Sequence, residues 1–455
     1  MRERIQAALR GSRADYTEIR LDDRESSRVV FRGQDLETAS VVLDRGGIVR
    51  CLVKDRGWGI ATFNDMQDLS HRVQQAYEGA RAIEGEEPIE LAPIPVSEEA
   101  ITVPLERDFR GITLTEKTAL TKEYNDIMLG YDSRIVDTQA VYMDRFSRVT
   151  FASSDGTFIE EEHPNVFVAC LAVGREDGNV QRTYEGAAKV AGFEAALGHH
   201  ELAETSARRA VDLLSAPRIK GGRYTVVCNP GLAGVFAHEA FGHLSEADFV
   251  YANPQAQEMM VLGRRFGKDI LTIADDGSLP GLRGSHRYDD EGTPAGRSDL
   301  IKNGVLVGRL HSRETAAKMG EQPTGNARAT GYRYPPIVRM TNTFVEAGET
   351  GFEEMIGDVE LGVYACDAFG GQTALESFSF SSAYAYMIRD GEIAEMVRDV
   401  ILSGNLFVTL DHIDAIGDDF QWMKRGGNCG KGQGGLAVGI GSPHVRIRDV
   451  LIGGD

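Results

Sequence analysis

The sequence lacks any run of about eighteen or more apolar residues, the length that a helix needs to cross a bilayer. It also lacks a charged segment followed by an apolar stretch after Met1, the pattern of a secretion leader. Its five cysteines are odd in number and form no Cys-x-x-Cys pair. They are Cys51, Cys170, Cys228, Cys366 and Cys429. These absences exclude a membrane-spanning helix and a disulfide-stapled secreted domain, and we expect a cytoplasmic protein.

Positive charge is also scarce. The chain has 49 Lys and Arg residues against 69 Asp and Glu residues, which gives a net charge of -20. Such a balance repels phosphate backbones and anionic lipid. Direct binding to nucleic acid or to a membrane surface is therefore not expected.

The chain of 455 residues is too long for one ordinary hydrophobic core, so two domains are expected. Apolar residues make up 42% of it, which is enough for globular packing. The break is expected near Pro217 and the pair Gly221-Gly222. It divides the chain into an N-terminal domain, 1–218, and a C-terminal domain, 219–455.

The N-terminal domain is predicted to combine helices with an antiparallel sheet. Alternating apolar and polar residues indicate strands, the first four of which look like a small meander, and Asp155-Gly156 is a hairpin turn. The strands are expected at 16–21, 28–31, 40–43, 49–53, 135–142, 147–152, 157–161 and 166–173. Helices are expected from an N-cap at Asn64 to Ile83, over 114–129 and over 194–214.

The C-terminal domain is predicted to be rich in strands. It opens with a strand at 224–228, after which Asn229-Pro230-Gly231 begins a helix. Asn303-Gly304 and Asp390-Gly391 mark two hairpins. The expected fold class is α+β.

Two histidines and an acid lie close together on that helix, as His238-Glu239-x-x-x-His243. Neutral imidazoles can hold zinc, and a carboxylate beside the first can take a proton from water that the metal activates. This is the chemistry of hydrolysis. Taken alone, the motif also fits two histidines that are satisfied by local hydrogen bonds.

The spacing of the histidines predicts a distorted helix. The common zinc-peptidase pattern His-Glu-x-x-His places its histidines four apart, on one helix face. Here they are five apart, and a regular helix would turn their rings about 140° away from each other. We therefore expect a π-bulge, or a helix end between Glu239 and His243, near Gly242.

A glycine-rich stretch at 424–435 contains Cys429 among Lys424, Arg425 and Lys431. Glycine lets the backbone approach another surface closely, and basic neighbours favour the thiolate, which is a metal ligand. A flexible loop with an incidental cysteine is the alternative. A phosphate-binding loop is set aside because the pattern G-x-x-x-x-G-K-[ST] is absent.

Together and in this order, these motifs resemble the TldD/PmbA family of metallopeptidases. The likeness rests on His238-Glu239-x-x-x-His243 and Cys429-Gly430-Lys431, with the segments 14–20, 289–294, 324–326 and 339–343, and runs nearly end to end. The chain is similar to the metal-bearing TldD type rather than to the type that lacks the motif.

The resemblance implies an N-terminal α/β domain and a β-rich C-terminal domain that carries the metal-site helix. It implies zinc held by His238, His243 and Cys429, with Glu239 as the general base. It also implies that the protein cleaves unfolded peptides inside a dimer. The partner is either a second copy or a paralogous PmbA-type subunit. Substrate-binding residues are not assigned, and turn chemistry accounts for 289–294 and 324–326 as well as a site role does.

Two alternatives stay open. Glu246, three residues beyond His243, competes with Cys429 as the third ligand, although it also suits a carboxylate that orients His243. The chain could also be a non-catalytic subunit ordered by zinc, or an interaction factor of a protease or gyrase-modulating complex. A closed fourth coordination position at the metal would favour the non-catalytic subunit.

Overall fold

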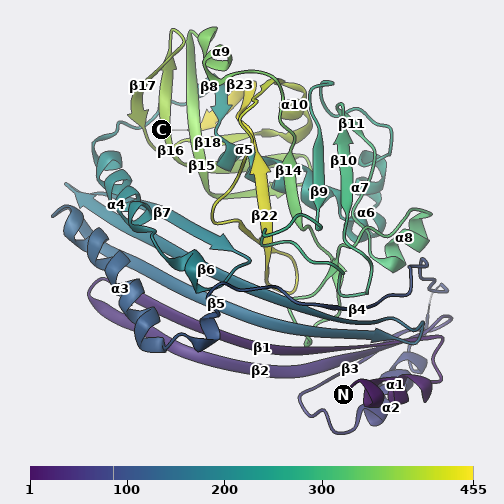
Figure 1. Ribbon diagram of the computed structural model, residues 1–455. Helices are drawn as coiled ribbons and strands as arrows, with labels where there is room; N and C mark the ends of the chain where they lie inside the picture. The colour runs from purple at the N-terminus through teal and green to yellow at the C-terminus, as the bar shows by residue number, and fades with distance from the viewer. Residues whose placement is uncertain (86, 454–455) are drawn as a thin grey trace.

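A computed structural model describes residues 1–85 and 87–453. A sheet of long, curved strands forms the base of the molecule, and the C-terminal half lies over it (Figure 1). The strand order is β3-β2-β1-β5-β6-β4, with β7 against β6, and the β4–β6 pair is parallel. These strands are β1 (Tyr16–Arg32), β2 (Asp35–Val53), β3 (Gly57–Phe63), β4 (Glu98–Ile101), β5 (Ile135–Ser153), β6 (Phe158–Glu176) and β7 (Asn179–Lys189).

The small meander expected in residues 16–53 is wrong. The four short segments are two long strands, β1 and β2, which pair without a break from residue 16 to residue 30 of β1. Charged residues such as Asp22 and Arg24 interrupt the apolar alternation, yet they stay in the strand because they pair with each other at 2.8 Å. In the same way β5 and β6 each join two expected strands, and they meet in the hairpin predicted at Asp155-Gly156.

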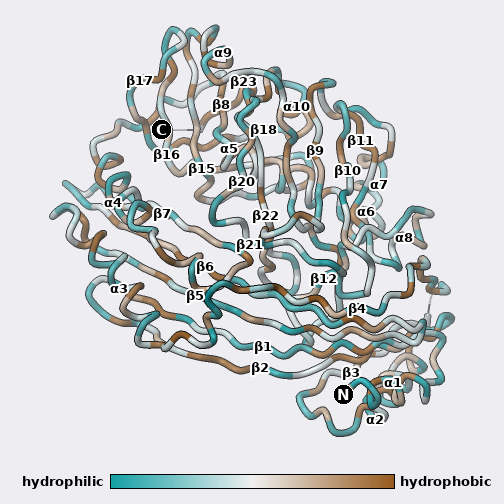
Figure 2. The backbone as a smooth tube through the Cα atoms, viewed as in Figure 1, coloured by the Kyte–Doolittle hydropathy of each residue, from teal (hydrophilic) through white to brown (hydrophobic). Residues whose placement is uncertain are grey.

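Helices cover one face of this sheet at both of its ends. Ile19 and Leu21 of β1 pack with α1 and α2, whereas Val29 and Phe31 pack with α3 and α4. Apolar and polar segments accordingly alternate along the long strands in Figure 2. The helices are α1 (Arg2–Arg10), α2 (Leu69–Arg81), α3 (Leu114–Tyr131) and α4 (His200–Ser215).

Two helix boundaries differ from the prediction. The N-cap of α2 is Asp68, which accepts a hydrogen bond from the backbone N–H of His71. Asn64 instead donates to the backbone oxygen of Arg45 at 2.8 Å. The helix expected over 194–214 is split into a 3-10 turn, Phe193–Ala196, and α4, with Gly198 between them at a φ of +76°.

The C-terminal half contains a closed ring of strands. Its order is β15-β8-β23-β18-β16, and β15 pairs back to β16, while β17 and β19 add to its sides. The strands are β8 (Gly222–Cys228), β15 (Leu361–Ala374), β16 (Ser377–Arg389), β17 (Glu392–Val397), β18 (Ile401–Asn405), β19 (Ile413–Ile416) and β23 (Val445–Gly453).

A second sheet stands beside the ring, in the order β11-β10-β9-β14-β22-β20, with β21 against β22. Its strands are β9 (Ile273–Asp276), β10 (Arg297–Lys302), β11 (Val305–Leu306), β14 (Asn342–Val345), β20 (Gln421–Trp422), β21 (Gly427–Gly430) and β22 (Gly435–Ser442). A small pair is formed by β12 (Ala327–Arg328) and β13 (Ile337–Val338). The hairpin turns predicted at Asn303-Gly304 and Asp390-Gly391 are confirmed, with positive φ at all four residues.

The helices of this half are short. They are α5 (Pro230–Ala237), α6 (Ala247–Ala252), α7 (Pro254–Met259), α8 (Arg313–Met319), α9 (Phe352–Gly357) and α10 (Leu406–Asp411). Of these, α5 is buried between β15 of the ring and β14 and β22 of the second sheet. No helix of the described residues has the length and apolar character that a membrane crossing needs.

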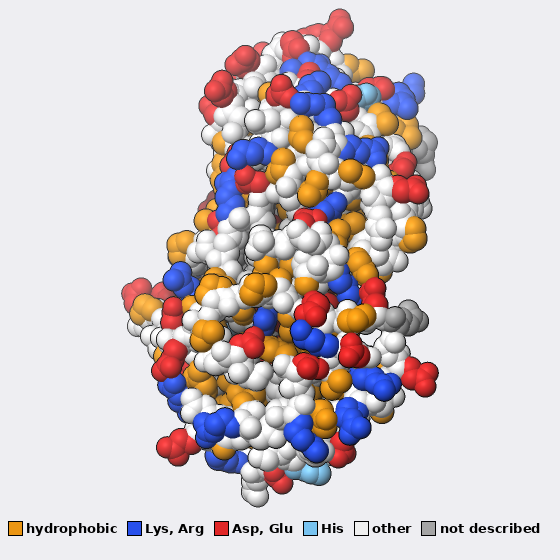
Figure 3. All heavy atoms as spheres, turned by 90° about the vertical axis from the view of Figure 1, so that its right-hand side faces the viewer, with side chains coloured by type: hydrophobic (Ala, Val, Ile, Leu, Met, Phe, Trp, Pro, Cys, Tyr) orange, Lys and Arg blue, Asp and Glu red, His pale blue; other side chains and the backbone are white. Residues whose placement is uncertain are grey.

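Helices and mostly antiparallel sheets confirm the α+β class. The division into 1–218 and 219–455 stays a prediction. The two halves are in close contact, and buried ion pairs join them. Arg20 pairs with Asp290 at 3.2 Å and Arg50 with Glu291 at 3.3 Å. Seen from the side, the surface mixes acidic and basic side chains over both halves (Figure 3).

Candidate metal centre

The helix that carries the motif changes its winding at the first histidine. Asn229 caps α5 through the backbone N–H of Leu232, and the chain continues as a π-helix over His238–Gly242 and a 3-10 turn over His243–Ser245. A π-turn closes i to i+5, so it brings residues five apart onto one face. The two imidazole centroids lie 5.3 Å apart. The predicted π-bulge is confirmed.

Gly242 is required by packing as well as by the distorted turn. A Cβ at this position would lie 1.9 Å from Sδ of Met340, a fully buried neighbour. A larger residue would push the π-turn away from the second sheet, and the two histidines would lose their common direction.

Cys429 reaches the histidines from a hairpin rather than from a flexible loop. It lies on β21, where it pairs with Leu436 of β22, and it is almost fully buried. One ligand atom each from His238, His243 and Cys429 lies within 4.8 Å of the others. His243 Nε2 is 3.5 Å from Cys429 Sγ. The structure therefore brings together all three residues that the sequence nominates.

This donor set fits Zn²⁺. For a tetrahedral zinc site, elementary geometry puts an imidazole nitrogen and a thiolate sulfur about 3.6 Å apart, close to the observed distance. Buried Nδ1 of His238 has no hydrogen-bond partner among the described residues. A buried polar atom without a partner is costly, and a metal ligand bond is one way to satisfy the ring.

Glu246 lies on the other side of the His243 ring. Its Oε2 is 3.1 Å from His243 Nδ1 and 3.1 Å from Lys431 Nζ. Its side chain is buried, and Nε2 of His243 is left to face Cys429. This arrangement favours the orienting role for Glu246, because a carboxylate on one ring nitrogen fixes the direction of the other.

The basic neighbours of Cys429 are engaged elsewhere. Lys431 binds Asp248 at 2.7 Å, and Arg425 lies over the ring of Tyr184. The hairpin is fixed instead by Arg339, a fully buried side chain that donates to the backbone oxygens of Cys429 and, at 3.3 Å, Gly434. The sequence placed Arg339 in the segment 339–343 but indicated no role for it, because nothing local distinguishes a buried arginine from an exposed one.

Electrostatics prepare the site for a cation. Burial, and then the neighbouring His243, lower the pKa of His238 to about 3, so its imidazole is neutral. Burial opposes charge on His243, yet hydrogen bonds to Cys429 and Glu246 raise its pKa to about 10. The surroundings of the His243 ring therefore stabilise positive charge.

Glu239 is half-buried and faces the same space. Burial raises its pKa above the ordinary value, which makes its carboxylate a stronger base. Both histidines, Cys429 and Glu239 line a cavity of about 1240 Å³ between the N-terminal sheet and the C-terminal half. The volume is large enough for several residues of an extended peptide.

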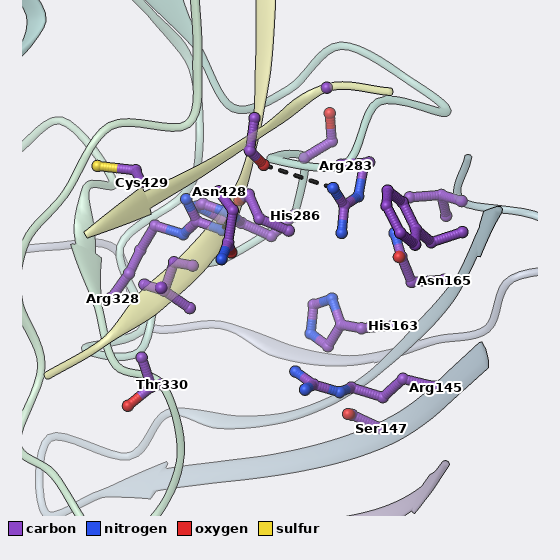
Figure 4. Close-up of a pocket in the computed structure, with 18 of the residues that line it drawn as sticks. Arg145, Ser147, His163, Asn165, Arg283, His286, Arg328, Thr330, Asn428 and Cys429 are labelled. Atoms are coloured by element: carbon purple, nitrogen blue, oxygen red, sulfur yellow. Dashed lines mark hydrogen bonds between the residues drawn. The ribbon is translucent and has the colours of Figure 1, made fainter. Parts of the chain in front are cut away.

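The opposite wall of the cavity was not anticipated. It carries Arg145 and His163 on β5 and β6, with Arg283 and His286 from the loop after β9 (Figure 4). One signal was present: the strands predicted in 135–173 alternate, and polar residues occupy one of their faces. No role was expected for that face, and the C-terminal half covers it.

The segments 289–294 and 324–326 show turn chemistry. Asp289 accepts hydrogen bonds from the backbone N–H groups of Glu291, Thr293 and Ala327, at 3.0, 2.8 and 2.9 Å. Thr324 Oγ1 accepts from the N–H of His311 at 2.7 Å. These contacts lie within the C-terminal half, where Asp289 also lines the cavity.

Family models match most of the chain. A PmbA/TldA metallopeptidase domain 1 matches residues 17–82, the central domain matches 107–214 and the C-terminal domain matches 221–454. Two solved structures share the fold over nearly their whole length. A proposed modulator of a DNA gyrase from Thermotoga maritima has a TM-score of 0.79 at 21% identity, covering 99% of both chains. TldE from Thermococcus kodakarensis has a TM-score of 0.77 at 16% identity, covering 100% of both.

Curated relatives extend the likeness to sequence. A protein of Saccharolobus solfataricus named zinc metalloprotease TldD homolog is 26% identical over 452 residues, 97% of each chain. A metalloprotease of Synechocystis sp. is 46% identical over 446 residues, 98% of this chain and 96% of that protein. With three family domains matched in order and this identity along almost the full length, the chain belongs to the TldD/PmbA family of metallopeptidases.

Proposed function

We propose that this chain is a zinc peptidase that cleaves unfolded peptides, with zinc held by His238, His243 and Cys429 and with Glu239 as general base. The observation that carries the proposal is the convergence of three donor atoms within 4.8 Å in the wall of a large cavity. Three protein ligands leave a fourth position open, as in catalytic rather than structural zinc sites.

Bound zinc supplies Lewis-acid activation of water and of the scissile carbonyl. Glu239 accepts the proton at its carboxylate and returns it to the leaving amine. Its raised pKa favours the first transfer, because a stronger base accepts a proton from water more readily. Glu246 keeps Nε2 of His243 directed at the metal through its hydrogen bond to Nδ1.

Unfolded substrates follow from the position of the site. Glu239 and the three ligands face a cavity between the two halves, and such a position favours an extended chain over a folded domain. An extended peptide can enter and bind through its backbone to strand edges such as β21. The relatives named metalloproteases support peptide-bond hydrolysis as the reaction.

Assembly and location belong to the same proposal. We place the protein in the cytoplasm as a dimer, formed either by two copies or with a PmbA-type subunit. The net charge of -20 disfavours direct contact with nucleic acid.

Removal of the metal is expected to stop peptide release. The purified chain is incubated with an unfolded protein, with zinc, with a chelator, and with the chelator followed by excess zinc. New amino termini should appear in the first and third samples and fall below about 1% of that rate in the second, since no other group activates water. Peptide release that persists after complete metal removal contradicts the proposal, and a non-catalytic subunit releases none in any sample.

A further inference from the structure

Two arginines of the cavity lining point into the same space, one from each half of the molecule. Arg145 projects from β5 and Arg283 from the loop between β9 and β10, on either side of His163 (Figure 4). Cys429 lies in the same view, across the cavity. Arg145 is exposed within the cavity, whereas Arg283 is partly buried.

Neither guanidinium has a carboxylate partner among the described residues. Arg283 donates to the backbone oxygens of Arg425 and Gly427 at 3.2 and 3.4 Å and lies over the ring of Phe167. Arg20 of the same lining differs, because it pairs with Asp22 at 3.1 Å and with Asp290 at 3.2 Å. Arg328 resembles Arg283, since it donates to the backbone oxygens of Met340 and Ala437.

The two charges are held together at a cost. Burial lowers the pKa of Arg283, and the positive charge of Arg145 lowers it further. Burial also lowers the pKa of Arg145, and Arg24 lowers it further, while Asp22 partly offsets both effects. Guanidinium groups nevertheless stay charged. A chain with a net charge of -20 therefore keeps two arginines without a carboxylate at ion-pair distance inside its cavity, where low-dielectric walls strengthen their attraction for an anion.

We propose that Arg145 and Arg283 bind a carboxylate of the substrate, so that the cavity prefers acidic peptides. The proposal rests on the proposed function for the nature of the ligand, a peptide. Guanidinium forks match the planar geometry of a carboxylate and bind it through charge-assisted hydrogen bonds. Burial lowers the pKa of His163 to about 3, so this ring is neutral and adds a hydrogen-bonding group between the two arginines.

Binding is measured on zinc-loaded Glu239→Gln, which should hold a peptide without cleaving it. The probes are labelled, unstructured peptides of about ten residues that differ only in charge: one with several glutamates and both ends blocked, its blocked glutamine counterpart, and the glutamine peptide with a free carboxyl end. The glutamate peptide should bind at least about tenfold more tightly than the blocked glutamine peptide. If only the free carboxyl end gives this gain, the terminus is the anchored carboxylate and the proposal stands.

The arginines are then removed in the same background. Arg145→Gln with Arg283→Gln should reduce the preference to within about twofold, and Arg145→Gln alone should reduce it severalfold. The single variant controls for misfolding. It should fold like the parent, because the Arg145 side chain forms no hydrogen bond or ion pair with the described residues. Arg56→Gln, in the exposed turn between β2 and β3, removes the same charge outside the cavity and should change nothing.

Equal binding of charged and neutral peptides by the parent would overturn the proposal, as would an unchanged preference in the double variant. Because the readout is binding, it is independent of turnover. A protein that prefers acidic peptides but never cleaves them would contradict the proposed function and leave this inference in place.

Discussion

Glu239→Gln is expected to lower the rate of peptide cleavage by about 10² to 10⁴-fold while zinc stays bound. The amide keeps the shape of the side chain but cannot accept a proton. Glu239 lies next to His238 and lines the cavity, and it is not one of the three groups whose ligand atoms converge. Cleavage is followed with a quenched fluorescent peptide, and zinc by metal analysis after gel filtration.

Glu258→Gln is the matched control, since it makes the same change on an exposed residue of the nearby helix α7. It should retain both activity and zinc. If Glu239→Gln cleaves within a few-fold of the parent rate, Glu239 has no part in the proton transfer. If it loses zinc, Glu239 is a ligand rather than a base.

Cys429→Ala is expected to abolish tight zinc binding. The change removes the single negatively charged donor of the site, and two neutral imidazoles alone bind zinc weakly. Affinity is measured by competition with a chromophoric chelator. Circular dichroism of the variant should match the parent, because hairpin β21–β22 is also held by Arg339 through backbone oxygens.

Glu246→Gln separates the two candidates for the third ligand. Through its contact with Nδ1 of His243, Glu246 orients the imidazole ring and does not bind the metal itself. Its loss should therefore weaken zinc affinity by about 10 to 100-fold. Full zinc occupancy in Cys429→Ala, together with none in Glu246→Gln, would reverse the assignment to a His-His-Glu site.

Local patterns in the sequence predict part of the fold. The three hairpins predicted at Asp-Gly or Asn-Gly are confirmed, because such turns depend on the residues within them. Two of the turns have positive φ at both residues, and the third has it at Gly156 alone. The long strands are not predictable in the same way. Asp22 and Arg24 interrupt the pattern of β1. Two of their partners, the backbone N–H of Tyr332 for Asp22 and the backbone oxygen of Thr330 for Arg24, lie 310 and 306 residues away in sequence and become visible only when these segments meet.

The same distinction applies to the site. Five-residue spacing predicts the π-turn because ring direction follows from helix geometry alone. Arg339 cannot be predicted, since its role depends on a hairpin ninety residues away in sequence, at Cys429. Arg145 lies on a strand face that looks solvent-exposed in sequence and that the C-terminal half turns into a cavity wall.

X-ray absorption at the zinc edge of the loaded protein tests the central claim, a zinc ion on His238, His243 and Cys429 with one open position. The account predicts one sulfur at about 2.3 Å, two imidazole nitrogens at about 2.0 to 2.1 Å and one exchangeable light atom. A spectrum without sulfur, or one with four protein ligands and no exchangeable position, would contradict it.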